Sequence, residues 1–191
     1  MSAFSRSLCR AALAAAVLLA PATAEAKLPQ LFGDKPIVEA AKLGAADDVN
    51  TAIIDGASAN SRAADGTPVI VLASIARSLD TIKLLIENGA RPDDKSKDES
   101  TALTIAATNG DLAIVTYLLD HKADVNEPGA LREVALIKAA RANHADVVKL
   151  LIDRGADRDE TDQSGATALE IADRASFKNV VALLKTKAGG K

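Results

Sequence analysis

Hydrophobic positions in this chain recur in short segments that polar turns separate. Between residues 101 and 126, two apolar segments flank a polar Asn109-Gly110-Asp111 turn. In the second segment, Leu112, Val115 and Leu118 follow one another at steps of three, which places them on one side of a helix. The pattern therefore predicts two short helices joined by a tight turn, with an apolar face that needs a neighbour.

The same unit recurs with a period of 33 residues. Gly56-Ala57 has equivalents at 89, 122 and 155, and Ala40 has alanine equivalents at 73, 106, 139 and 172. A third column at the same spacing begins at Val49 and holds only β-branched residues. A fixed period of this length indicates a solenoid, in which each helix pair covers the apolar face of the next.

The block from Gly165 to Ala172 (GATALEIA), the Asn109-Gly110-Asp111 turn and the Gly-Ala closings make the unit resemble the ankyrin repeat. The resemblance covers residues 34–187. It implies an all-α fold, an ankyrin-repeat solenoid of stacked helix-turn-helix units with hairpin-like loops, built of four full repeats plus an N-terminal half-repeat. The helix starts depart from the family pattern: only Thr67-Pro68 keeps the threonine-proline pair, the opening histidine is missing from every unit, and Val134 stands where threonine is usual. We expect weaker helix starts there and an unchanged period.

The first 26 residues are a different kind of sequence. Arg6 and Arg10 precede an apolar run from Ala11 to Ala20, and small residues follow at Ala24 and Ala26. This order predicts a secretory signal peptide that is cleaved after Ala24 or Ala26, because the apolar run is too short to cross a bilayer. The alternative is a frayed N-terminal helix of the solenoid. Export predicts a periplasmic or secreted protein, and the whole resembles an exported bacterial ankyrin repeat protein.

We divide the chain into four parts. They are a signal peptide (1–26), a lead-in segment (27–35), an ankyrin repeat domain (36–187) and a flexible tail (188–191). In the lead-in segment, Leu28, Leu31 and Phe32 are expected to cover the open end of the first helix pair, because a solenoid needs its ends closed. The alternative is a tether that a partner grips.

Composition and charge exclude several kinds of site and partner. The one cysteine, Cys9, lies in the predicted signal peptide, so the processed chain is expected to lack thiol nucleophiles, zinc thiolates and disulfides. The formal net charge is −3, whereas nucleic-acid binders are strongly basic, so no nucleic-acid partner is expected. No second apolar run has membrane length, so no membrane contact is expected after the signal peptide is removed.

The sequence predicts no catalytic site, no cofactor site and no metal site. The two histidines, His121 and His144, belong to different repeats, and His144 lies at a turn between helices that it is expected to stabilise. The run from Asp157 to Thr161 starts like a calcium loop, but Asp162 stands where that loop requires glycine. Since phosphate loops and nucleophile elbows are also missing, we predict no enzyme activity. A hydrolase or ligand-binding protein on the same frame would need residues that the sequence does not offer.

The remaining candidate site is a concave surface. The resemblance implies that hairpin tips and the ends of the first helix of each pair bind a protein partner. Carried onto this sequence, the predicted partner-binding residues are Lys42, Asp65, Lys97, Asp98, Thr108, Asn109, Leu131, Arg141, Gln163, Ser164 and Arg174. Ser74 fills the helix-end position of one further unit, where the residues between Gly66 and Ala73 can be aligned in two ways that differ by one residue.

Two features of this surface suggest how it could bind a partner, and each has an alternative explanation. The row of Lys42, Arg141 and Arg174 either attracts an acidic patch on a partner or merely keeps helix ends soluble. Leu131 is an apolar residue at a loop tip, within the divergent third loop (128–133), which either contacts the partner or has simply diverged.

These observations predict a monomeric, non-enzymatic protein-protein interaction module in an exported compartment. It would bind one folded protein as a scaffold or accessory factor. The alternative is an immunity-type neutraliser of a toxic or lytic enzyme in the same compartment, which would use the same face. A neutraliser should bind with a nanomolar or lower Kd and abolish an activity, whereas a scaffold can bind more weakly and preserve it.

Overall fold

The computed structural model describes residues 35–186, which lie within a compact unit from Gly33 to Lys191. The predicted signal peptide, the lead-in segment up to residue 34 and the predicted tail lie outside the described residues. The helices, in chain order, are α1 (Pro36–Leu43), α2 (Ala46–Ile54), α3 (Val69–Ile75), α4 (Leu79–Glu87), α5 (Ala102–Asn109), α6 (Leu112–Asp120), α7 (Ala135–Arg141), α8 (Ala145–Asp153), α9 (Ala168–Arg174) and α10 (Lys178–Lys185). A short 3-10 helix, η1 (Ala130–Arg132), lies in the loop before α7.

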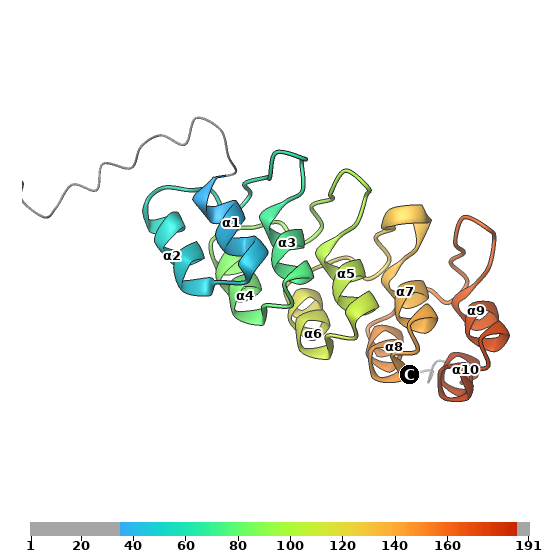
Figure 1. The fold of residues 1–191 in the computed structure, drawn as a ribbon. Helices are drawn as coiled ribbons and strands as arrows, with labels where there is room; N and C mark the ends of the chain where they lie inside the picture. The colour runs from blue at the N-terminus through green and yellow to red at the C-terminus, as the bar shows by residue number, and fades with distance from the viewer. Residues whose placement is uncertain (1–34, 187–191) are drawn as a thin grey trace, which may run out of the picture. The chain divides into compact units, whose positions relative to one another are not determined.

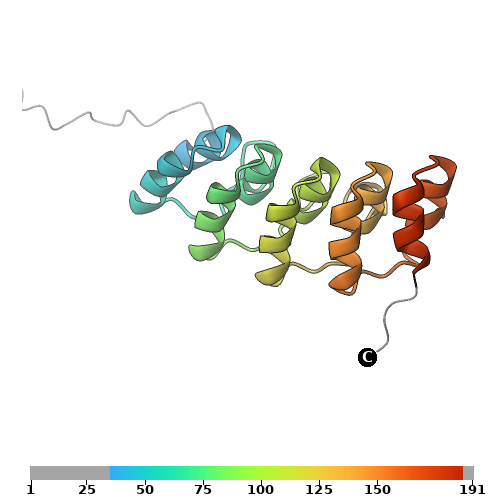
Figure 2. The same cartoon turned by 90° about the horizontal axis from the view of Figure 1, so that it is seen from below.

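Helix pairs stack in chain order within this unit. Each first helix packs against its own second helix, and α1, α3, α5 and α7 each also pack against the first helix of the next pair (Figure 1). The second helices form a parallel row, which Figure 2 shows from below. The predicted all-α solenoid is therefore confirmed for the described residues, and the half-repeat expected ahead of the first loop consists of α1 and α2. None of the helices within residues 35–186 is both long and apolar enough to span a bilayer.

Local sequence explains where the first helices begin. The Thr101 hydroxyl accepts a hydrogen bond from the Thr104 backbone N–H, and Thr167 does the same for Glu170, so α5 and α9 each start with a capping box. Helix α7 starts after Val134 with no side-chain cap. The weaker start that the sequence predicts for this unit is therefore present. The loops before α3 and α9 each contain one antiparallel bridge, which makes them hairpin-like as expected.

The core lies between neighbouring pairs. The alanine column is buried at Ala106 and Ala139, where first helices meet, and larger side chains there would overpack the contact. In α6, Val115 and Leu118 are buried as predicted. The prediction for Leu112 is wrong: it is 40% exposed, because the buried face of α6 is centred on residues 114, 115 and 118.

Both end faces of the stack are polar. Asp48 in α2 is exposed, whereas the equivalent Val147 of an inner unit is fully buried. Glu170 and Asp173 in α9 are exposed, whereas the residue equivalent to Glu170 in α7, Ile137, is fully buried. The first and last pairs thus carry charge where inner pairs bury apolar side chains, so these faces tolerate water.

Hydrogen bonds along the loops and turns hold the units in register. The side-chain oxygens of Asn60, Asp93 and Asn126 each accept the backbone N–H of a residue 31 positions later, at 3.0, 3.0 and 2.9 Å. His144 Nε2 donates to the Thr108 carbonyl oxygen of the preceding unit at 3.0 Å. The turn-stabilising role predicted for His144 is therefore confirmed.

Candidate functional site

The predicted partner-binding residues occupy two kinds of position. Six of them lie in the loops that precede the first helices: Asp65, Lys97, Asp98, Leu131, Gln163 and Ser164. The other five lie in the last turns of first helices: Lys42, Thr108, Asn109, Arg141 and Arg174. The loops before α3, α5, α7 and α9 project in one row from the first-helix side of the stack (Figure 1).

One predicted helix-end residue is wrong. Ser74 is fully buried, and its hydroxyl donates to the Ile70 carbonyl oxygen at 3.2 Å. Its neighbour Ile75 is 55% exposed and occupies the position that Thr108 and Arg141 hold in the next two units. The structure therefore resolves the one-residue ambiguity of that unit in favour of the uninterrupted 33-residue period. It adds an exposed apolar side chain that sequence reasoning missed.

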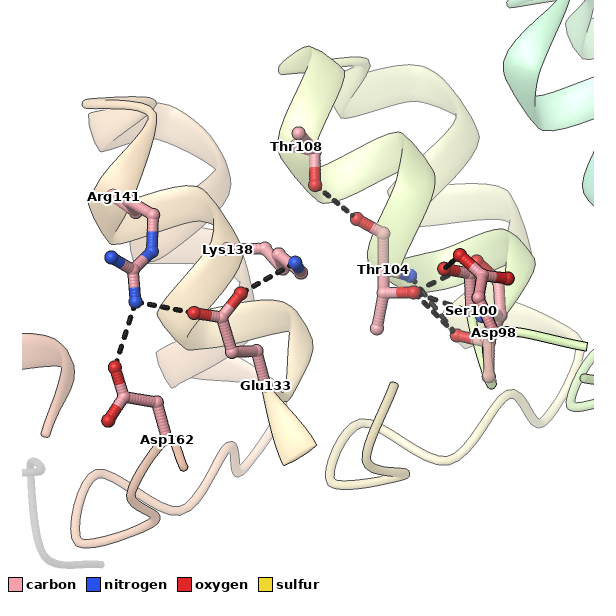
Figure 3. A network of polar contacts seen from close by, with 9 residues as sticks. Asp98, Ser100, Thr104, Thr108, Glu133, Lys138, Arg141 and Asp162 are labelled. Atoms are coloured by element: carbon pink, nitrogen blue, oxygen red, sulfur yellow. Dashed lines mark hydrogen bonds and ion pairs between the residues drawn. The ribbon is translucent and has the colours of Figure 1, made fainter. Parts of the chain in front are cut away.

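Arg141 belongs to an ion-pair network (Figure 3). The Glu133 side chain is 6% exposed, lies 2.5 Å from Lys138 Nζ and accepts a hydrogen bond from Arg141. Arg141 Nη2 also donates to Asp162 Oδ2 at 2.9 Å, which ties the loop before α9 to α7. Arg141 thus has a structural role in addition to any partner contact. Sequence reasoning missed Glu133, because no local pattern pairs residues this far apart along the chain.

Two carboxylates organise loop tips. Asp162 accepts hydrogen bonds from the Ser164 hydroxyl at 2.6 Å and from the backbone N–H of Ala166 at 3.0 Å. These bonds, led by that from Ser164 and aided by Arg141, lower the pKa of Asp162 from 3.8 to about 2. In the loop before α5, hydrogen bonds from serine hydroxyls, chiefly that of Ser96, lower the pKa of Asp98. Asp98 and Ser164 therefore shape their own loops.

The remaining central residues also make contacts within the stack. The Thr108 hydroxyl donates to the Thr104 carbonyl oxygen at 2.8 Å, one turn earlier in α5. Asn109 Nδ2 donates to the Ser74 carbonyl oxygen of the preceding unit at 3.4 Å. Thr108 is exposed and Asn109 half-buried, so of this pair Thr108 is the one that presents its side chain to solvent.

A groove runs across the last two units. Its larger part, about 600 Å³, is lined by residues that include Leu131, Arg141 and Gln163. A second part, about 380 Å³, shares Arg141 and Ser164 with the first and reaches Arg174. We call the two parts together the C-terminal groove. Five predicted residues thus meet at one place, whereas the others lie on earlier units.

The predicted basic row is therefore not one cluster. Arg141 and Arg174 line the same groove, whereas Lys42 lies on α1 and forms an ion pair with Glu39 at 3.2 Å. Within residues 35–186, no group of three or more His, Cys, Asp or Glu side chains is placed to hold a metal ion.

Leu131 lines the C-terminal groove, and both its exposure and its backbone conformation are unfavourable. It is 61% exposed, and its φ of 59° lies in the left-handed region, as does the φ of 60° at Arg132. A left-handed conformation costs a residue with a side chain about 1–2 kcal/mol. Neither the exposure nor the strain helps the chain fold, so Leu131 is the residue whose placement most needs a functional explanation.

Comparison with known proteins yields two matches to family models. A model described as ankyrin repeats (3 copies) matches residues 37–129. A second, described as ankyrin repeats (many copies), matches residues 128–172. Together the matched stretches contain α2 to α8 and most of α1 and α9. A search of curated proteins gives no significant match.

Proposed function

This chain belongs to the ankyrin repeat family, and we propose that it holds one folded protein partner on the face formed by its loop tips and first helices. Ankyrin repeats are protein-protein interaction modules. The proposed protein has no chemistry of its own, acts as a monomer, and serves as a scaffold or accessory factor in the compartment to which the predicted signal peptide directs it.

The observation that supports this proposal most is Leu131. An exposed leucine in a left-handed conformation is unfavourable in the free protein, whereas a partner that covers the side chain would recover its burial. In many interfaces a few fully buried side chains contribute most of the binding free energy. Ile75, exposed on the same first-helix side, is a second apolar contact available to a partner that spans several units.

A capture experiment tests the proposal. The full-length chain with a C-terminal tag is expressed in its native host, and co-purified proteins are identified for the wild type and for Leu131→Asp. Ile54→Asp is the matched control, because Ile54 is a 77% exposed apolar residue at the end of the second helix α2. Arg141 is left intact, since its bonds to Glu133 and Asp162 make its substitution a test of folding.

We expect one protein to be captured by the wild type and the Ile54→Asp variant and to be lost from Leu131→Asp, with equal circular dichroism spectra for all three. Equal capture by Leu131→Asp, or no capture by the wild type, would contradict the proposal. The intact mass of the tagged protein reports whether the predicted signal peptide is removed. If the captured protein is an enzyme that loses its activity in the complex, the neutraliser alternative replaces the scaffold.

A further inference from the structure

The C-terminal groove has two parts, and their linings differ in chemistry. Its two parts share Arg141, Asp162 and Ser164, so they form one continuous depression between the loops before α7 and α9 and along α9. The exposed leucine Leu131 lies at one end and the guanidinium of Arg174 lies at the other. A groove that reaches from a loop tip to a helix end suits an extended segment of a partner.

The groove is basic within an acidic protein. Its lining contains three cations and two carboxylates, although the whole chain has a formal net charge of −3. Both carboxylates, Glu133 and Asp162, are already engaged by Arg141. The side chain of Arg174, by contrast, is exposed and makes no hydrogen bond or ion pair with the chain between residues 35 and 186. A carboxylate brought to Arg174 would find an unoccupied donor.

Arg141 has further donors for the same segment. Both of its bonds, to Glu133 and to Asp162, are made by Nη2. Its Nε and Nη1 have no acceptor among residues 35–186, so their N–H groups are available to a carboxylate or a backbone carbonyl. The arginine is also held in place by these two bonds, so a partner would not have to order it, and this lowers the entropic cost of binding.

We propose that the C-terminal groove binds an acidic segment of the protein partner in an extended conformation. One carboxylate pairs with Arg174, and an apolar side chain a few residues away packs on Leu131. The two carboxylates leave the lining with a net charge of only about +1, which favours a peptide with one or two carboxylates over a nucleic-acid backbone. This inference rests on the proposed function and specifies the partner's chemistry.

Peptide selection tests the inference without a known partner. A phage-displayed library of random peptides, each about twelve residues long, is panned on the immobilised protein, and the most enriched peptide is made with a fluorescent label. We expect the enriched sequences to contain Asp or Glu a few residues from Leu, Ile, Val or Phe. Anisotropy titrations then give the Kd for each variant. Arg174→Glu and Leu131→Asp should each raise the Kd at least about tenfold, as central contacts do.

Two controls match these variants. Lys178→Glu makes the same charge change as Arg174→Glu, but on an exposed lysine of the second helix α10. Ile54→Asp matches Leu131→Asp, as above. Both controls should leave the Kd within about twofold of the wild type. Salt should weaken wild-type binding more than Arg174→Glu binding, because exposed ion pairs are screened.

Several results would overturn the inference. They are enriched peptides without an excess of acidic residues, an unchanged Kd for Arg174→Glu, and displacement of the peptide by a single-stranded oligonucleotide. If no peptide is enriched but a Leu131-dependent partner is captured, the inference that the groove binds an acidic segment is wrong, and the proposed function stands. If peptides bind the groove but the capture experiment fails, the groove exists and the scaffold role is wrong.

Discussion

Replacing Gly110 with alanine should weaken the contact between the third and fourth helix pairs. Gly110 ends α5 with a φ of 74°, in the left-handed region. A β-carbon at this position would lie 2.5 Å from Nδ1 of His144, well inside van der Waals contact. The His144 ring would then have to move, and its hydrogen bond to the Thr108 carbonyl oxygen would be lost.

The expected cost has two parts. An alanine in the left-handed region costs about 1–2 kcal/mol, of which a few tenths to about 1 kcal/mol is offset because alanine restricts the unfolded chain. Displacing the His144 ring adds about 1 kcal/mol for the lost hydrogen bond and a similar amount for disturbed packing. We therefore expect Gly110→Ala to lower the free energy of unfolding by about 2–4 kcal/mol.

A matched glycine separates the two parts. Gly89 has a φ of 83°, and a β-carbon there would meet nothing within 4 Å, so Gly89→Ala carries the backbone strain alone. Urea unfolding followed by far-ultraviolet circular dichroism should show the larger loss for Gly110→Ala. In a His144→Ala background, Gly110→Ala should cost about as little as Gly89→Ala. Equal costs for Gly110→Ala and Gly89→Ala in the wild-type background would refute the reasoning.

Three further predictions concern the loop tips and the core. Leu131→Gly should raise the free energy of unfolding by up to about 1 kcal/mol in urea unfolding, because it relieves left-handed strain, while partner capture falls. Asp162 has a pKa lowered from 3.8 to about 2, so its charged form favours the folded state. Its contribution is complete above its ordinary pKa and is lost as the pH falls toward 2, so the stability difference between wild type and Asp162→Asn should shrink across that range in acid unfolding. Leu118→Ala, at a fully buried position, should cost about 2–5 kcal/mol in urea unfolding, whereas Leu112→Ala should cost less than about 1 kcal/mol.

The repeat fold could be predicted because the residues that form the helices, the turns and the core recur at a fixed period. A 33-residue period fixes which residues share a column, and a column shares one environment along the stack. His144 was placed correctly at a turn for this reason. The prediction for Leu112 is wrong because the period gives the column but not the side of a short helix that the column faces. The prediction for Ser74 is wrong because Ser74 lies one position off the 33-residue column that contains Ile75 and Thr108. In α3 and α6, a shift of one or two positions turns a side chain from the core to solvent.

The site could be predicted only in part, because its decisive contacts join distant residues. Leu131 and Arg174 follow from their columns, since a loop tip and a helix end are exposed in every unit. The roles of Glu133 and Arg141 depend on a bond between two side chains eight residues apart and a second bond to the next loop. No periodic rule states that a charged residue will be neutralised from another element, so the sequence overestimates how many of the cations are free.

The third loop either contacts a partner or has merely diverged, and its construction favours contact. Gly129 is fitted tightly: a β-carbon there would lie 2.9 Å from Thr104, and its backbone N–H donates to the Glu133 carbonyl oxygen at 3.2 Å. Glu133 in turn is buried between two cations. Divergence alone explains lost order, but this loop is closed by specific contacts around a leucine that is both strained and exposed. These contacts hold Leu131 in an exposed, left-handed conformation that is unfavourable in the free protein. A partner that buries the side chain would explain why the loop keeps it there.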